Sequence, residues 1–319
     1  MRCNPVKRLF FVVLCALAFE LAFAVDAAAQ PAVKSADAAA QPAVKSAVKA
    51  VDVAAQPSLG IALYDVDRLY DTIPSKFYDD RDYTPSGSLG WSADRYARKI
   101  ANTAAVLDSM AMPLVALCGV ENEQVVRDLT EACKADYAYL HRTSDFGLGM
   151  DFALLYYGDM FLPVRVEEYG YALCVEGEMA MGSVSAGKDA VVGEAEGRKI
   201  AVIIARRPRN LEHIISRVRQ RNSECSVIVL GEMYEADFKR LGLRDATSQS
   251  EQSGYGTAVK GDRWVMTHRV ATDMRDADRC KVYIKRWLLD RRGYPKPTYR
   301  GGKYEGGYSL YLPVCLYFD

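Results

Sequence analysis

Residues 199–230 read KIAVIIARRPRNLEHIISRVRQRNSECSVIVL. The apolar runs at 199–205 and 226–230 have the length and composition of buried strands. Between them, residues 211–221 alternate apolar side chains with arginines at helical spacing, which predicts an amphipathic helix. A strand, a helix and a second strand in this order are typical of an α/β fold.

The alternation of strands and helices extends in both directions from this stretch. Further strands are predicted at residues 59–64, 114–118, 136–141, 151–157, 162–167, 171–175, 263–270 and 312–318. Further helices are predicted at 122–133 and after Ser92, which can cap an apolar stripe running from Tyr96 to Met110. Interleaved strands and helices, together with hairpin-like strand pairs, predict a mixed-sheet α/β domain.

The first 24 residues have the pattern of a secretory signal peptide. Lys7 and Arg8 precede an almost unbroken apolar run, and Ala22-Phe23-Ala24 offers small residues at the two positions that a signal peptidase reads. The run is shorter than the ~20 residues that span a bilayer; an uncleaved membrane anchor is the alternative. We expect an exported protein, periplasmic or extracellular, without a transmembrane domain after signal cleavage.

Residues 25–57 are predicted to be a disordered linker. The string DAAAQPAVKSA occupies residues 26–36 and is repeated without a change at 37–47, and a decayed third copy ends at Pro57. Short units of small side chains cannot bury a core, and the prolines break each helix. This leaves residues 58–319 as one globular domain.

Composition restricts the classes of function. Lysine plus arginine and aspartate plus glutamate each total 41, so the net charge is zero and no basic field indicates a nucleic-acid-binding protein. The six cysteines beyond residue 24 contain no Cys-x-x-Cys pair, so neither a zinc site nor a redox motif is supported. Several lie in apolar runs and are expected to be buried free thiols.

The strings at residues 63–71, 120–122, 149–156 and 295–302 resemble motifs of secreted bacterial members of the endonuclease/exonuclease/phosphatase superfamily. LYDVDRLYD at residues 63–71 is similar to that group's Y-N-V-E-N-L-F-D motif. Val120-Glu121-Asn122 is similar to E-V-E-N, and GMDFALLY at 149–156 is similar to G-I-D-V-A-L-L-Y. The matches continue in the right order to PKPTYRGG at 295–302. The resemblance implies a DNase I-like α/β fold, a four-layer sandwich of two mixed β-sheets flanked by helices.

The resemblance also implies a catalytically degenerate member. Enzymes of this superfamily cleave phosphoesters with magnesium or manganese. The positions at which this chain departs from their motifs are Asp65 for an asparagine, Gly119 for the metal-binding glutamate, Arg206 for a phosphate-contacting histidine, Glu232 and Tyr234 for the aspartate and asparagine of G-D-F-N, His268 for the aspartate of W-x-x-x-D, and Leu310 and Tyr311 for the terminal aspartate–histidine pair. Leucine cannot move a proton, and a tyrosine with a pKa near ~10 is a poor base at neutral pH.

Two hypotheses follow from these departures. The first is a pseudoenzyme that acts as a non-catalytic binding or interaction module and needs no cofactor. In it Glu121 and Asp151 have structural roles. The alternative is a divergent phosphodiesterase or phosphatase that uses Mg²⁺ or Mn²⁺ in a rearranged site built from Asp65, Glu121, Asp151 and Glu232.

Three arginines indicate a ligand class under the first hypothesis. Arg206, Arg207 and Arg209 lie where an active relative would bind phosphate, and guanidinium groups suit phosphate and carboxylate. The partner is unknown, and a phosphate-bearing or acidic ligand is the chemistry that fits. A solvated basic loop is the alternative.

Overall fold

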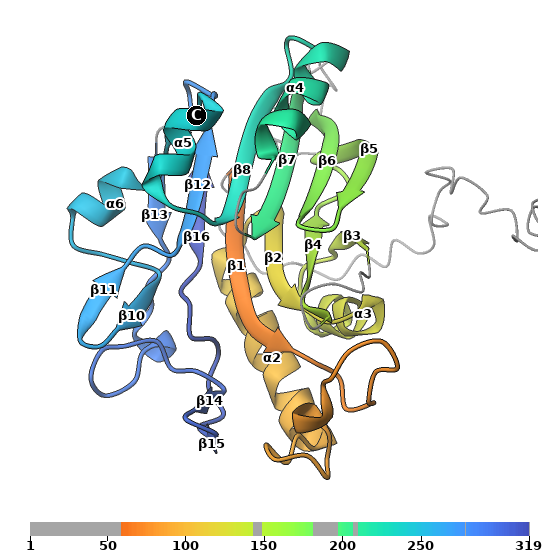
Figure 1. The fold of residues 1–319 in the computed structure, drawn as a ribbon, viewed down its shortest axis with the longest axis vertical. Coiled ribbons are helices and arrows are strands. Elements are labelled where there is room, and N and C mark those ends of the chain that lie inside the picture. Colours follow the sequence, from red (N-terminus) through yellow and green to blue (C-terminus); the bar gives the residue numbers. More distant parts are fainter. Residues whose placement is uncertain (1–58, 143–148, 181–196, 207–209, 278, 319) are drawn as a thin grey trace, which may run out of the picture. The chain divides into compact units, whose positions relative to one another are not determined.

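A computed structural model describes residues 59–142, 149–180, 197–206, 210–277 and 279–318 (Figure 1). The chain divides into two units, Met1–Val53 and Ala54–Asp319, and every described residue belongs to the second. The predicted signal peptide and linker lie outside the described residues, as do Arg207 and Arg209. Within the described part of the chain, no helix is both long and apolar enough to cross a bilayer.

Two six-stranded sheets form the frame of the second unit. The first sheet has the order β13 (Arg279–Val282), β16 (Val314–Tyr317), β1 (Gly60–Leu69), β2 (Leu114–Val120), β4 (Asp151–Tyr156) and β3 (Ala138–His141). The second has the order β5 (Phe161–Tyr169), β6 (Ala172–Met179), β7 (Arg198–Arg206), β8 (Ser226–Glu232), β12 (His268–Thr272) and β9 (Arg244–Asp245). Each sheet is mixed, because β1 runs parallel to β2 and β7 parallel to β8 while the other neighbours are antiparallel.

Helices and short ladders complete the unit. The helices are α2 (Ala93–Met110), α3 (Glu123–Ala132), α4 (Leu211–Arg221), α5 (Glu235–Leu241) and α6 (Ser248–Gln252), with 3-10 turns at Arg81–Tyr83 and Arg286–Leu288. The two-stranded ladders pair β10 (Ala258–Lys260) with β11 (Arg263–Val265) and β14 (Tyr299–Arg300) with β15 (Lys303–Tyr304). The predicted cap at Ser92 is confirmed, because its side chain accepts a hydrogen bond from the Arg95 backbone N–H. Asn122, predicted only as the first residue of the next helix, caps that helix and accepts a hydrogen bond from the Val125 backbone N–H.

Strict alternation along the central strands creates the layers. On β1, Ile61 and Leu63 pack into the core between the two sheets, whereas Ala62 and Tyr64 pack with α2 and α3 on the outer face. β7 alternates in the same way, with one set of side chains between the sheets and the other set under α4 and α5. Figure 1 shows α2 and α3 with the strands of the first sheet and α4 and α5 beside β7, β8 and β12 of the second. The predicted four-layer α/β sandwich is confirmed.

The single strand predicted at 263–270 is wrong, because the structure has two strands there. β11 ends at Val265 and pairs with β10, whereas β12 starts at His268 and pairs with β8. At the break between β11 and β12, Thr257 Oγ1 accepts hydrogen bonds from the backbone N–H groups of Thr267 and His268, each at 3.1 Å. These two N–H groups are therefore not used in strand pairing. The break brings His268 to the start of β12.

The six cysteines of the described residues are free thiols. All are buried except the half-buried Cys133. Burial raises the pKa of Cys174 to about 12 and that of Cys225 to about 11, which keeps both as unreactive thiols at neutral pH. The expectation of buried free thiols is confirmed for these positions.

Candidate functional site

An irregular segment at the end of β1 forms the floor of the candidate site. Asp65 is the last regularly paired residue there, and the register shifts between it and Leu69. Asp67 and Arg68 have φ angles of 54° and 59°, and the Asp67 N–H donates to Asp65 Oδ1 at 2.9 Å. Gly119 on the adjacent strand has φ 82°, a conformation that favours glycine. The register shift between Asp65 and Leu69 on β1 thus lies beside the one between Cys118 and Val120 on β2. Such β-bulges are common beside functional sites.

A network of an imidazole and a guanidinium surrounds the buried Asp65 carboxylate. His268 Nε2 lies 3.0 Å from Asp65 Oδ2, and Arg206 Nη2 lies 3.9 Å from the same oxygen. Burial alone would raise the pKa of Asp65, but the hydrogen bond from His268, the charge of that imidazole and the charge of Arg206 outweigh it and hold the pKa below its ordinary value. The other imidazole nitrogen, Nδ1, lies 3.2 Å from Thr267 Oγ1. Both nitrogens of His268 are therefore engaged.

Two more of the predicted positions join this network. The ring of Tyr311 packs edge-on against the imidazole of His268, with a centroid distance of 4.5 Å. Burial, with the nearby carboxylates, raises the pKa of the Tyr311 hydroxyl to about 12. Glu232 is paired in register with His268 on one side and Arg206 on the other. The site thus draws residues from both sheets and from the segment before β16.

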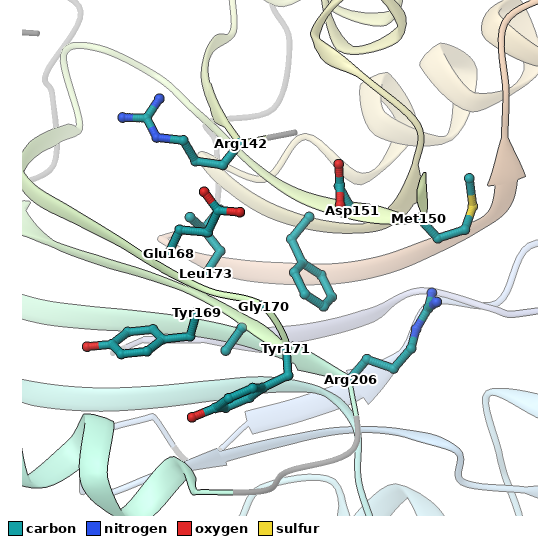
Figure 2. A pocket seen from close by; sticks show the side chains of 11 residues that line it. Arg142, Met150, Asp151, Glu168, Tyr169, Gly170, Tyr171, Leu173 and Arg206 are labelled. Atoms are coloured by element: carbon teal, nitrogen blue, oxygen red, sulfur yellow. The ribbon is translucent and has the colours of Figure 1, made fainter. Parts of the chain in front are cut away.

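Asp65, Arg206, Glu232 and Tyr311 of this network line a cavity of about 420 Å³. Its wall is formed by Asp65, Asp67, Arg68, Tyr70, Asp79, Asp80, Asp82, Tyr83, Met150, Arg206, Glu232 and Tyr311. A second, smaller pocket of about 130 Å³ shares Met150 and Arg206 with it. Figure 2 shows this smaller pocket, with Met150 and Arg206 at one end and Arg142 and Glu168 at the other. Arg206 therefore lies where the two cavities adjoin.

Glu121 and Asp151 are held away from Asp65 by contacts of their own. Glu121 accepts hydrogen bonds from the Asp71 backbone N–H at 2.7 Å and from the Tyr78 hydroxyl at 2.9 Å, so it anchors the loop that follows β1. The Asp151 carboxylate lies 3.9 Å from the buried imidazole of His141. Neither residue lines the 420 Å³ cavity.

The structure brings together six of the eight departing positions. Asp65, Arg206, Glu232, His268 and Tyr311 are joined as described, and a Cβ added at Gly119 would lie 3.0 Å from Asp65 Oδ1. Tyr234 is 68% exposed and does not line the cavity. Leu310 lines a neighbouring pocket of about 200 Å³. Arg206 is the one member of the predicted arginine cluster that the structure describes.

Eight of the twelve cavity residues were not among the predicted site positions. Four of these eight, Asp79, Asp80, Asp82 and Tyr83, belong to the loop between β1 and α2, and the three aspartates give one wall of the cavity an acidic character. The run DDRDY at 79–83 was the available signal, but a short acidic run in a loop is most often solvated.

Comparison with known proteins identifies the family. The profile of the endonuclease/exonuclease/phosphatase family matches residues 60–240, which is more than half of the chain. The chain belongs to the endonuclease/exonuclease/phosphatase family. No curated protein matches the sequence.

Several solved structures share the fold at low sequence identity. An endonuclease/exonuclease/phosphatase from Bacteroides vulgatus is 10% identical, with a TM-score of 0.51 over 82% of this chain and 98% of that one. A mannosyl-6-phosphatase from Bacteroides thetaiotaomicron is 13% identical, with a TM-score of 0.51 over 82% of this chain and 100% of that one. Truncated TDP2 from Caenorhabditis elegans is 13% identical, with a TM-score of 0.50 over 82% and 98%. These similarities show the fold alone and confirm the DNase I-like class.

The residues of this family member do not fit the divalent metal that the resemblance implies. Among the described residues, no three His, Cys, Asp or Glu side chains are grouped so that they could hold a metal ion. The carboxylate at the centre of the site, Asp65, is bound by an imidazole and a guanidinium of the chain itself. The four candidates Asp65, Glu121, Asp151 and Glu232 are not brought together as one ligand set.

The buried Glu121 predicts an unusual pH dependence of stability. Burial raises the pKa of this carboxyl to about 7. Between about pH 4.5 and 7 the folded state then binds more protons at Glu121 than the unfolded state does, so this residue makes the free energy of unfolding fall as pH rises. Glu121→Gln keeps the size of the side chain and removes that titration, so we expect it to stabilise the protein by ~1–2 kcal/mol at pH 8 relative to its effect at pH 5.

Urea unfolding at a series of pH values measures this effect. Glu131→Gln, at an exposed carboxylate of α3, is the matched control and should leave the pH profile unchanged. Parallel pH profiles for wild type and Glu121→Gln would contradict the prediction.

Proposed function

We propose that this protein is a pseudoenzyme, a non-catalytic binding module built on the endonuclease/exonuclease/phosphatase fold. The observation that carries the proposal is the pairing of Asp65 with His268 and Arg206. In this arrangement, an imidazole and a guanidinium of the chain occupy the central carboxylate. A divalent ion would have to displace both groups, and it would find no group of three ligands among the described residues.

The chemistry of the surrounding side chains supports the same proposal. Hydrolysis of a phosphoester needs an activated water and a group that transfers protons near neutral pH. Tyr311, with its pKa raised to about 12, is a poor base, and Leu310 has no proton to transfer. His268 is buried with both nitrogens engaged, so it is not placed to exchange a proton with a substrate.

The setting of the module is part of the proposal. The signal-peptide pattern of residues 1–24 and the repeat linker of 25–57 would place the domain outside the cytoplasm on a flexible tether. The anion-binding role of Arg206 with Arg207 and Arg209 stays a prediction.

An activity assay tests the proposed function. The full chain is incubated with Mn²⁺ or Mg²⁺ and a panel of phosphomonoesters and phosphodiesters, including DNA, RNA and mannose 6-phosphate. A mannosyl-6-phosphatase of the same fold is assayed in parallel as the positive control. We expect no turnover above the blank, because losing several members of one catalytic unit leaves little beyond binding.

Turnover would support the alternative of a divergent phosphohydrolase. To exclude a contaminating enzyme, the assay is repeated with Glu232→Ala, which removes a carboxylate of the cavity wall. Mn²⁺-dependent turnover by the wild type that disappears in this variant would overturn the pseudoenzyme proposal.

A further inference from the structure

A basic groove lies on the segment between β13 and β16. Residues 285–305 hold seven lysines and arginines against two acids, in a chain whose net charge is zero, and the structure describes all of these residues. The groove has a volume of about 470 Å³ and is lined by Arg286, Leu289, Asp290, Arg291, Lys296, Lys303, Tyr304 and Glu305. It shares no lining residue with the 420 Å³ cavity beside Asp65, so it is a separate feature of the domain.

The two carboxylates of the basic groove are engaged by its own scaffold. Asp290 Oδ1 accepts hydrogen bonds from the backbone N–H groups of Arg292 at 2.9 Å and Tyr294 at 3.1 Å, which fixes a turn. Arg300 on β14 lies 3.0 Å from Asp290 Oδ2 and 3.3 Å from Glu305 Oε1, and so ties that turn to the β14–β15 ladder. Each carboxylate is therefore compensated by an arginine that does not line the groove.

The four cations of the lining are left without ion pairs. The side chains of Arg291, Lys296 and Lys303 form neither an ion pair nor a hydrogen bond with any residue that the structure describes. Arg286 Nη1 donates to the carbonyl oxygen of Asp290 at 3.3 Å, which is a neutral partner. Four like charges around one concave surface create a positive potential that attracts anions.

The charges next to the groove do not reverse its sign. Arg95 of α2 adds a cation, because its guanidinium lies 4.4 Å from the centroid of the tyrosine ring in the lining. A further acid, Asp262, lies 3.5 Å from the Tyr294 hydroxyl. Lys260 and Arg263, which pair with each other across the same β10–β11 turn, offset this acid.

We infer that the basic groove binds a phosphate ester. The groups that contact the phosphate oxygens are its four cations, Arg286, Arg291, Lys296 and Lys303. Guanidinium groups bind phosphate in a bidentate manner, and lysines add point charges that suit a doubly charged ester. The volume of the groove lies within the range of small-molecule sites. The inference goes beyond the proposed function, because it concerns a surface apart from the candidate site.

The concentration of the charge in one groove favours a phosphate ester over nucleic acid. A nucleic-acid-binding surface spreads lysines and arginines along a face that follows many phosphates. Here the cations converge on a single hollow of a chain with zero net charge. Trp287, next to Arg286, is 39% exposed, and an aromatic ring beside basic side chains is typical of proteins that contact lipid headgroups. The ester can therefore be free or part of a lipid.

Two probes distinguish these sources. Glycerol 3-phosphate represents a free ester, and its binding to the full chain is measured by titration calorimetry in EDTA, so that neither metal nor turnover enters the result. Vesicles of one part phosphatidic acid to three parts phosphatidylcholine present the same group at a bilayer. Their binding is measured by sedimentation as the difference from pure phosphatidylcholine vesicles. We expect one or both probes to bind, with an affinity that falls as the salt concentration rises.

Variants assign the binding to the basic groove. Lys296→Gln and Lys303→Gln each remove one charge, and we expect each to weaken binding by about tenfold. Lys303 is exposed, so its variant remains decisive if Lys296→Gln does not fold. Lys134→Gln, at an exposed lysine that follows α3, is the matched control and should bind as the wild type does.

The outcomes separate this inference from the proposed function. The inference is overturned if neither probe binds, or if Lys303→Gln binds like Lys134→Gln, which would place the anion elsewhere, as at Arg206. It is also overturned if duplex DNA binds more tightly than either probe and loses that affinity in Lys303→Gln. None of these results touches the absence of catalysis, which the phosphoester assay measures independently.

Discussion

His268→Leu is expected to lower the free energy of unfolding by about 3–5 kcal/mol at pH 7, because it removes the imidazole that bonds the buried Asp65 carboxylate and leaves that charge largely uncompensated. Asp65 would keep its charge in a buried position with only Arg206, at 3.9 Å, to compensate it. Leucine fills much of the imidazole volume, so little of the loss comes from packing. Denaturant unfolding of the full chain measures the change.

A double-mutant cycle with Asp65→Asn isolates the pair. The Asn substitution removes the charge that His268 compensates, so the double variant should be more stable than His268→Leu alone. Because the pKa of Asp65 is held below 3.8, the pair contributes stability above that pH and loses it as pH falls through the folded-state pKa. A loss below about 1 kcal/mol, or one that persists unchanged in strong acid, would contradict the role assigned to the pair.

Restoring the family's metal-binding glutamate at Gly119 is expected to lower the free energy of unfolding. Gly119→Glu places a side chain at φ 82°, where a Cβ lies 3.0 Å from Asp65 Oδ1 and 3.3 Å from the Arg68 backbone nitrogen. The left-handed backbone costs ~1–2 kcal/mol, and the close contacts with a second carboxylate add to this. We expect a total loss of about 2–4 kcal/mol, with no gain in Mn²⁺ affinity by calorimetry.

Two glycines separate the causes of that loss. Gly254 has the same φ of 82° but open space around it, so Gly254→Glu measures the backbone contribution alone. Gly158 lies in open space without a left-handed φ, and Gly158→Glu should be close to neutral. The prediction is contradicted if Gly119→Glu lowers the free energy of unfolding no more than Gly254→Glu does. It is also contradicted if Gly119→Glu creates a Mn²⁺ site.

The layers of the fold were predictable because their cause is local. Apolar side chains recur at strand spacing over residues 199–205 and at helical spacing over residues 211–221. Each pattern extends over several residues, so one exception does not obscure the predicted element. Short elements with few apolar residues were not predictable: β13 has only Cys280 and Val282 as apolar members, and α5 and α6 are seven and five residues long. The break before His268 depends on Thr257, a residue that a local pattern does not include.

The positions of the candidate site were predictable through the resemblance, but their contacts were not. Asp65 and His268 are 203 residues apart, and no periodicity relates them. Each was recognised as a departure from a motif, yet the fact that the two departures compensate each other appears only when β1 and β12 come together. The role of Glu121 depends likewise on the Asp71 N–H and the Tyr78 hydroxyl, which a motif comparison does not weigh.

The place of β16 in the first sheet constrains how the chain is assembled during synthesis. β16 lies between β13 and β1, and Gly60 pairs with Tyr317. One edge of β1 therefore stays open in a nascent chain until almost the whole domain has left the ribosome. An open strand edge invites pairing with other chains. The first sheet can close only after translation of Val314–Tyr317.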